Sequence, residues 1–143
     1  MAKSFTGMLP TAYSPAFLKL FARSLHWEAW EQLIRQNGWT IDRPYRSRHP
    51  LFPEIIYPID YGYINGTRSS DGEPVDLFVG RGHRGLVGAI LTIDRRRGKR
   101  EVKFLYNCTA EEVWSTVHQL RPAAAGGLSG PSLSHVVAVE RLG

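Results

Sequence analysis

The first regular pattern of apolar positions lies over residues 14–38. Its apolar members, three or four residues apart, are Phe17, Leu20, Phe21, Leu25, Ala29, Leu33 and Ile34. This spacing places them on one face of an α-helix, and Ser14-Pro15 is a typical helix start because serine caps a helix and proline fits its first position. The pattern therefore predicts one amphipathic helix over residues 14–38, about six turns long. Its wide apolar face also suits a homo-oligomer.

Aromatic side chains on this helix have a structural interpretation. His26, Trp27 and Trp30 are interpreted as packing or partner-facing residues, because aromatics at helical spacing usually fill cores.

Short apolar runs dominate the middle of the chain. They cover residues 77–79, 86–94 and 101–106, with glycine-rich or basic segments between them, and this arrangement predicts strands of an antiparallel sheet. The segment Thr109-Ala110-Glu111-Glu112 has capping-box spacing, and the apolar positions after it share one helical face as far as Pro122, so a second, short helix is predicted there. The predicted fold class is α+β, mainly β.

The length of 143 residues allows one domain with one core. We expect a flexible N-terminal tail over 1–13, a single domain over 14–121 that includes the first helix, and a flexible or weakly ordered C-terminal segment over 122–143. That last segment is rich in Ala, Gly and Ser and holds at most one edge strand, at residues 136–139.

Composition indicates a soluble protein of the reducing cytoplasm. Hydrophobic residues make up 43% and charged residues 22% of the chain, and no apolar run is long enough to span a bilayer. The start of the chain lacks the apolar core of a signal peptide, and one cysteine, Cys108, allows no intramolecular disulfide. The net charge of +5 predicts attraction for anions, whether phosphate, nucleic acid or acidic membrane.

Two basic segments help to decide which kind of anion the protein binds. Residues 39–58 are too rich in proline for a helix, and we expect an extended connection whose Arg43, Arg46 and Arg48 present forked donors that suit phosphate oxygens. Residues 95–100 carry five basic side chains, and we interpret them as the solvated end of a hairpin in preference to a nucleic-acid surface.

The main candidate for chemistry is an acidic turn. Asp71, Glu73 and Asp76 place three carboxylates within six residues, and the last of them begins an apolar strand. Mg²⁺ prefers oxygen ligands and is commonly held by a few carboxylates together with substrate phosphates. An ordinary solvated turn uses the same residue types, so both interpretations remain open at this point.

A longer pattern resembles a known family. The run YPIDYGYI at residues 57–64, followed by DGEPVDL at residues 71–77, resembles the signature region of the soluble family I inorganic pyrophosphatases. The resemblance covers residues 55–105. It implies a small, curved, OB-like β-barrel with helices packed outside, an active site at the barrel mouth, and Mg²⁺-dependent hydrolysis of pyrophosphate to two phosphates.

The resemblance also assigns residues. It implies that Mg²⁺ is bound by a set of carboxylates, namely Asp71, Glu73, Asp76, Asp94 and Glu101. The implied catalytic residues are Glu73, which orients and deprotonates the attacking water, Tyr61 and Lys103. The implied substrate-binding residues are Arg43, Arg48, Lys103 and Tyr61. Glu101 and Lys103 are two positions apart, so on a strand they share a face.

Three departures from the family pattern predict weakened activity. Glu73 stands where the family usually has Asp, and a shift of the carboxylate by on the order of 1 Å can cost about a hundredfold in rate. Pro50 stands where a phosphate-binding lysine is expected. The late Tyr-Lys phosphate contacts of the family have no evident counterpart in residues 122–143.

Pyrophosphate hydrolysis is therefore the leading hypothesis. One alternative is the same chemistry on another small phosphoanhydride or phosphoester. The other is a non-catalytic descendant that binds a nucleotide, RNA or a protein. We expect a small phosphate substrate, no membrane or nucleic-acid partner, and leave a homo-oligomer open.

Overall fold

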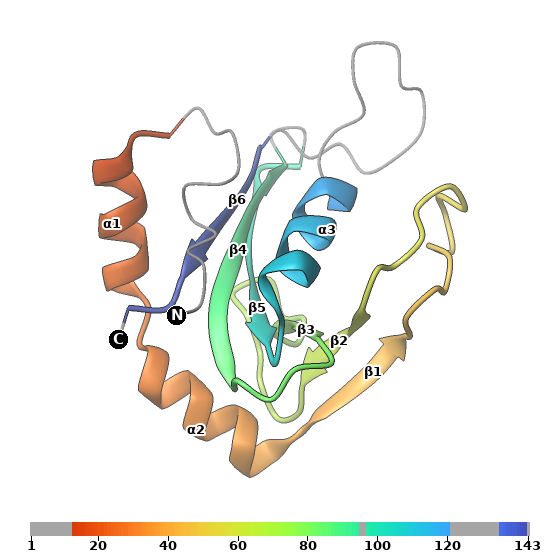
Figure 1. Cartoon of the computed structure of the whole chain (residues 1–143), viewed down its shortest axis with the longest axis horizontal. Helices are drawn as coiled ribbons and strands as arrows, with labels where there is room; N and C mark the ends of the chain where they lie inside the picture. The colour runs from red at the N-terminus through yellow and green to blue at the C-terminus, as the bar shows by residue number, and fades with distance from the viewer. Residues whose placement is uncertain (1–12, 95–96, 121–134, 143) are drawn as a thin grey trace.

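The computed structural model describes residues 13–94, 97–120 and 135–142. Within them, three helices and six strands form an α+β fold (Figure 1). The helices are α1 (Pro15–Ser24), α2 (Trp27–Asn37) and α3 (Ala110–Leu120). The strands are β1 (Trp39–Arg43), β2 (Asp60–Ile64), β3 (Asp76–Val79), β4 (Leu86–Asp94), β5 (Lys99–Tyr106) and β6 (His135–Glu140).

The six strands make one sheet in the order β1-β2-β3-β5-β4-β6. All neighbours are antiparallel except β3 and β5, which run parallel. The three predicted apolar runs are strands β3, β4 and β5, as expected, but the antiparallel prediction is wrong for the β3–β5 pair. Strands β4 and β5 form a hairpin, so one edge of β5 pairs with β4 and its other edge pairs with β3. The β3–β5 pairing joins segments that are distant in the chain, and local patterns do not encode it.

The expected closed barrel is not formed by the described residues. Strands β1 and β6 lie at opposite edges of the sheet and do not pair with each other, so the sheet stays open. Local spacing specifies strands but not the pairing between the first and last of them. The segment over 39–58, expected to be an extended connection, begins with β1 and continues as an irregular hairpin that carries one bridge, between Arg48 and Ile56.

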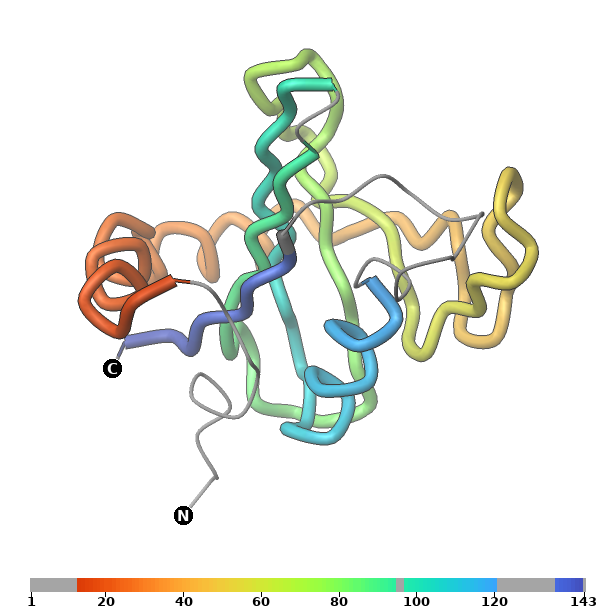
Figure 2. The backbone as a smooth tube through the Cα atoms, turned by 90° about the horizontal axis from the view of Figure 1, so that it is seen from above, coloured from red at the N-terminus to blue at the C-terminus, as the bar shows by residue number. Residues whose placement is uncertain are grey.

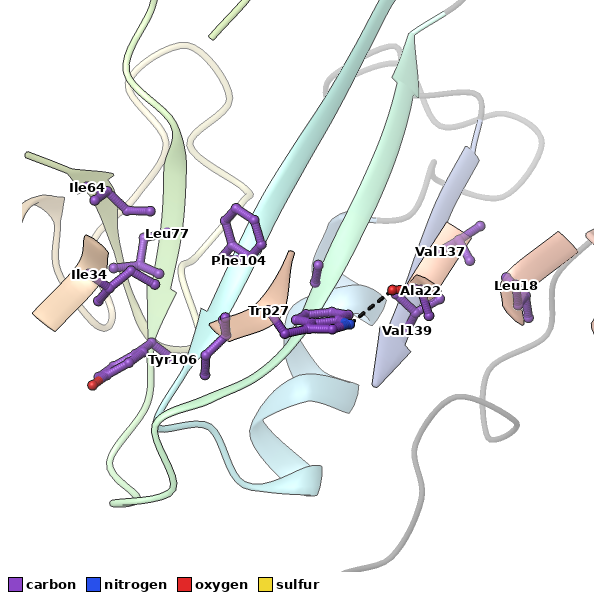
Figure 3. Close-up of a cluster of buried hydrophobic side chains, with 12 residues drawn as sticks. Leu18, Ala22, Trp27, Ile34, Ile64, Leu77, Phe104, Tyr106, Val137 and Val139 are labelled. Atoms are coloured by element: carbon purple, nitrogen blue, oxygen red, sulfur yellow. Dashed lines mark hydrogen bonds between the residues drawn. The ribbon is translucent and has the colours of Figure 1, made fainter. Parts of the chain in front are cut away.

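The predicted single helix over 14–38 is two helices. Leu25 has an extended backbone (φ −87°, ψ 131°), which ends α1, and α2 begins two residues later. The indole Nε1 of Trp27 donates a hydrogen bond of 2.9 Å to the carbonyl of Ala22 and ties the two helices together across the break (Figure 3). The break lets α1 pack on β6 and α2 pack on β4, which one straight helix could not do on a twisted sheet.

The other helix signals are confirmed. The Ser14 hydroxyl accepts a hydrogen bond from the Phe17 amide at the start of α1, with Pro15 at the first helical position. At α3, Thr109 and Glu112 form the reciprocal capping box: Glu112 Oε1 accepts from the Thr109 amide, and Thr109 Oγ1 accepts from the Glu112 amide.

Two hydrophobic clusters occupy the two faces of the sheet. Helices α1 and α2 cover one face and α3 covers the other (Figures 1 and 2). Neighbouring residues on a strand alternate between them: Leu77 and Phe104 pack with α1 and α2, whereas Phe78 and Leu105 pack with α3. Because both faces are covered, the strands appear in the sequence as continuous apolar runs.

Trp27 and Trp30 have the packing role expected of them. Trp27 is buried in the first cluster, and the Trp30 ring lies 4.6 Å from that of Phe104. Cys108 is buried in the second cluster, where desolvation raises the pKa of its thiol to about 12.

The ends of the chain fall largely outside the described residues. The expected tail over 1–13 and most of the segment 122–143 lie there. Within the described part of the latter, β6 pairs with β4 at the sheet edge, as expected of residues 136–139, and those four residues are buried. None of the helices in the described ranges is long and apolar enough to cross a membrane.

Candidate functional site

The centre of the candidate site lies where β3 and β5 run parallel. Asp76 stands beside Lys103 in the register of this pair, and the Lys103 ammonium donates to Asp76 Oδ2 at 2.7 Å, Glu101 Oε2 at 3.1 Å and the Tyr61 hydroxyl at 3.1 Å. We call these four residues the Lys103 cluster. Glu101 and Lys103 do share a face of β5, since their side chains meet.

Lys103 is charged in spite of being only 6% exposed. Desolvation acts to lower the pKa of its ammonium, but Tyr61, Asp76 and Glu101 outweigh that effect and leave the pKa raised. Burial is also the main cause of a raised pKa at the Tyr61 hydroxyl, which is therefore protonated at neutral pH. The cluster thus holds a fixed positive charge, one neutral hydroxyl and two carboxylates.

Arg43 extends the positive charge from the end of β1. Its guanidinium donates a hydrogen bond to the Tyr57 hydroxyl and lies over the rings of Tyr57 and Tyr61, 5.6 Å and 5.8 Å from their centroids. Desolvation opposes its charge, yet the contacts with Tyr57 and Tyr61 leave its pKa raised. Two protein cations therefore flank Tyr61.

The acidic turn lies beside this centre. The Ser69 amide donates to the Glu73 carbonyl (2.7 Å), and Gly72, with φ +88°, takes a conformation that glycine adopts without strain. Asp71 accepts hydrogen bonds from the Ser69 hydroxyl and the Glu73 amide, and Lys99 Nζ lies 3.6 Å from its Oδ2. The bond from Ser69, then that from Glu73, and the charge of Lys99 lower the pKa of Asp71, so this carboxylate is ionised at neutral pH.

Asp94 lies at the end of β4. It is 8% exposed, its Oδ1 accepts a hydrogen bond from the Arg97 amide, and Arg97 Nε lies 3.8 Å from its Oδ2.

Two neighbouring clefts collect these side chains. The first has a volume of about 810 Å³, and five carboxylates line it: Asp42, Asp71, Glu73, Asp76 and Glu101. The second has a volume of about 610 Å³ and is lined by Asp94, Glu101 and Lys103, among others. Arg43, Tyr61, Lys99 and Glu101 line both, so the clefts meet at the Lys103 cluster.

One predicted residue lies elsewhere. Arg48 is exposed in the hairpin after β1, where its guanidinium donates to the Pro53 carbonyl (2.8 Å), and it lines neither cleft. The other predicted site residues all line at least one of the two clefts.

The carboxylates fit Mg²⁺ in one particular way. Nowhere in the described ranges do three or more carboxylate, His or Cys side chains lie close enough together to hold an ion by themselves. Mg²⁺ is usually bound through one or two carboxylates, with waters and substrate phosphates completing its coordination. The carboxylates along the first cleft suit that mode, in which phosphate brings the ion and completes its site.

Sequence reasoning missed two cleft residues. Lys99 belongs to the basic run that was interpreted as a solvated hairpin end, yet it pairs with Asp71 and lines both clefts. Tyr57 stands at the start of the YPIDYGYI run, four positions before Tyr61, and an even spacing in an extended segment places two side chains on the same face. That spacing could have indicated that Tyr57 lies beside Tyr61, and their rings do stack at 5.4 Å.

Comparison with known proteins points to one family. A family model described as inorganic pyrophosphatase matches residues 36–94. The inorganic pyrophosphatase of Corynebacterium glutamicum is 42% identical over 48 residues, which is 31% of this chain and 30% of that protein. Those of Haemophilus ducreyi (60% over 25 residues; 18% and 14%) and Aeropyrum pernix (48% over 29 residues; 20% and 16%) are also similar.

These matches are short, since each spans less than a third of the relative's own length. The family-model match nevertheless runs from the end of α2 through β4 and contains the whole acidic turn and the YPIDYGYI run. Over residues 36–94, this chain is therefore similar to the inorganic pyrophosphatase family.

Proposed function

We propose that this protein hydrolyses inorganic pyrophosphate to two phosphates with the help of Mg²⁺. The observation that carries the proposal is the meeting of the two clefts at the Lys103 cluster, where protein cations and carboxylates lie within hydrogen-bond distance of one another. A phosphoanhydride needs both, because cations neutralise its oxygens and carboxylates hold the metal.

The five carboxylates predicted from the sequence have two proposed tasks, metal binding and proton transfer, and metal binding involves all of them. Asp71, Asp76, Asp94 and Glu101 would hold Mg²⁺, with Glu73 contributing from the exposed turn. Mg²⁺ neutralises charge on the phosphate oxygens and makes a bound water more acidic.

The basic side chains hold the phosphates. Lys103 and Arg43 lie over the Tyr61 ring, and Lys99 adds a third positive charge at the junction of the clefts. A pyrophosphate bound here is oriented by fixed donors, which is how phosphoryl transfer is mainly accelerated.

Glu73 acts as the base. It takes a proton from the attacking water, the water oxygen forms a bond to one phosphorus, and the bridging P–O bond breaks. The electron pair of that bond leaves with the second phosphate, whose charge is stabilised by Lys103 and Arg43. We assign this activity to the cytoplasm, where a buried free thiol such as Cys108 is the usual state.

The test measures phosphate release from pyrophosphate near neutral pH, with and without Mg²⁺. Wild-type protein should show Mg²⁺-dependent release, and Asp76→Asn should lower it by about a hundredfold or more, because it removes both a metal ligand and the partner of Lys103. Glu111→Gln on the outer surface of α3 is the control that removes a carboxylate outside the clefts, and it should keep full activity.

Two results would overturn the proposal. One is release by Asp76→Asn at the wild-type rate. The other is no Mg²⁺-dependent release by folded wild-type protein, which would favour a non-catalytic phosphate-binding role.

A further inference from the structure

The second cleft has a wall that pyrophosphate does not need. Its lining holds Arg43, Lys99 and Lys103, and it also includes a group of mostly apolar side chains, beside which Thr116 and Gln119 of α3 are polar. This group comes from the hairpin after β1 and from the last turn of α3, through His49, Leu51, Phe52, Ile55, Pro58 and Leu120. Figures 1 and 2 show this hairpin, drawn in yellow, on the α3 side of the sheet.

Hydrogen bonds hold the hairpin wall in place. The amide of His49 donates to the Ile55 carbonyl (2.9 Å), and the amide of Tyr57 donates to the Ser47 carbonyl (2.9 Å). At the hairpin tip, His49 Nδ1 accepts hydrogen bonds from the Leu51 and Phe52 amides at 3.1 Å and 3.2 Å. The wall is therefore a formed surface and not an adaptable loop.

A series of aromatic rings connects this wall to the cationic end. The Phe52 and His49 rings lie 5.0 Å apart, and His49 is nearly parallel to Tyr57 (6.3 Å, 13°). Tyr57 in turn stacks on Tyr61 (5.4 Å, 17°), which belongs to the Lys103 cluster. Tyr57 and Tyr61 cover each other's faces, whereas the His49 and Phe52 rings at the outer end are only partly buried. A flat group on the substrate would lie against these two outer rings, with its phosphates toward the cations.

Solvent exposure and cleft volume also indicate room for an organic group on the substrate. Leu51 is 75% exposed at the mouth of this cleft, an apolar side chain without cover. A volume of about 610 Å³ falls in the range of about 300–1,000 Å³ that is typical of sites for drug-sized ligands. Pyrophosphate has no apolar surface to place against such a wall.

We propose that the site also takes a diphosphate monoester whose organic group is a flat aromatic ring system, as in a nucleoside diphosphate. This inference rests on the proposed function, because the terminal phosphates would lie where pyrophosphate is proposed to lie. In the reaction, the oxygen of water bonds to the terminal phosphorus and the bridging P–O bond breaks. The bridging oxygen keeps the electron pair, Glu73 takes the proton, and the products are phosphate and the phosphate monoester.

The first experiment compares two non-hydrolysable probes by isothermal titration calorimetry in the presence of Mg²⁺. Adenosine 5′-(α,β-methylene)diphosphate carries the aromatic group, and methylenediphosphonate is the matching probe without it. We expect the adenosine compound to bind at least about fivefold more tightly, since base–aromatic stacking is worth about 1–3 kcal/mol per base. Equal or weaker binding would overturn the proposal.

A third probe tests the aromatic character of the ligand. Butyl methylenediphosphonate has an apolar but not a flat group, and we expect it to bind more weakly than the adenosine compound. If it binds equally well or better, the assignment of an aromatic group is wrong and the wall serves alkyl diphosphates.

Matched variants locate the contact. The quantity compared is the affinity for the adenosine compound divided by that for methylenediphosphonate. Leu51→Ser should lower this ratio by at least threefold, and Leu51→Trp should raise it. Both variants should fold, because Leu51 is largely exposed. Leu20→Ser removes a similarly exposed leucine (66%) from α1, away from the cleft, and should leave the ratio unchanged. A ratio that does not respond to either substitution of Leu51 would overturn the proposal.

Turnover separates this proposal from the proposed function. Pyrophosphate hydrolysis without a preference for the adenosine probe leaves the proposed function intact and overturns only the aromatic subsite. Tight binding of the adenosine probe without turnover of either pyrophosphate or ADP supports the subsite but overturns the hydrolytic step.

Discussion

The ammonium of Lys103 and the Oδ2 of Asp76 lie 2.7 Å apart across the parallel strands β3 and β5. The Lys103 side chain is 8% exposed, whereas those of Asp76 and Glu101 are 26% and 35% exposed. A buried cation thus lies beneath two carboxylates that reach solvent in the cleft. This arrangement fixes the position of the carboxylates and keeps their mutual repulsion low.

Replacing Lys103 by Met should destabilise the protein. The change leaves Asp76 and Glu101 without the cation between them and the Tyr61 hydroxyl without its donor. The expected loss is about 1–3 kcal/mol in the free energy of unfolding, measured by urea titration at neutral pH. Lys103→Arg keeps the charge and should lose less. A Met variant as stable as the wild type would show that the cluster does not stabilise the fold.

Glu73→Asp should increase activity if Glu73 is the base. The shorter side chain places the carboxylate where the family usually has it, and a correction on the order of 1 Å is worth up to about a hundredfold in rate. We expect at least a tenfold rise in kcat for pyrophosphate. Glu73 is exposed in the turn, so the fold should tolerate the change.

The matched variant is Glu73→Gln, which keeps the length but cannot take a proton, and it should lower kcat. If Asp and Gln at this position have the same effect on kcat, Glu73 is not the base and the turn only supports its neighbours.

The acidic turn and the strand that follows could be predicted from sequence because their signals are local. Asp71, Gly72 and Glu73 specify a turn through hydrogen bonds between near neighbours, and Asp76 begins an apolar run. The caps of α1 and α3 were predictable for the same reason: Ser14 and Thr109 each bond to an amide three residues away.

What the sequence did not reveal depends on distant pairings. Lys103 meets Asp76 because β5 runs parallel to β3, and Lys99 reaches Asp71 because the β4–β5 hairpin extends beside the acidic turn. The break after Ser24 arises from packing of α1 on β6, more than a hundred residues later in the chain. No periodic pattern within one element carries that information.

His49 should make the stability of the hairpin depend on pH. Burial, and then the charge of Arg43, lower the pKa of His49 below its ordinary value of 6.5. Below pH 6.5 the unfolded chain therefore takes up a proton before the folded one does, and stability falls until folded His49 is protonated as well. Protonation at Nδ1 also removes the acceptor of the Leu51 and Phe52 amides.

The measurement is the free energy of unfolding between pH 7.5 and 5.5, together with the NMR titration of the His49 ring. His49→Gln should flatten this part of the stability profile, whereas His83→Gln, at an exposed position, should not. An NMR titration of His49 at or above its ordinary pKa would contradict the prediction.

Gly62 should be the least replaceable residue of the β1–β2 pair. A Cβ at this position would lie 1.8 Å from the Thr40 carbonyl oxygen, so β1 would have to move away from β2. Because Arg43 ends β1, that movement would also displace its guanidinium from Tyr57 and Tyr61. Gly62→Ala should therefore cost about 3 kcal/mol or more of stability and should also weaken phosphate binding.

The control for Gly62→Ala is Gly98→Ala in the β4–β5 turn. Gly98 has φ +64° but no atom within 4 Å of an added Cβ, so this change carries only the backbone cost of about 1–2 kcal/mol. Both variants are compared by urea unfolding and by titration with methylenediphosphonate in the presence of Mg²⁺. Equal losses in the two variants would mean that close approach of β1 to β2 is not what holds Arg43 over the tyrosines. A larger loss in Gly62→Ala, in stability and in affinity together, would tie the glycine of the YPIDYGYI run to the position of that arginine.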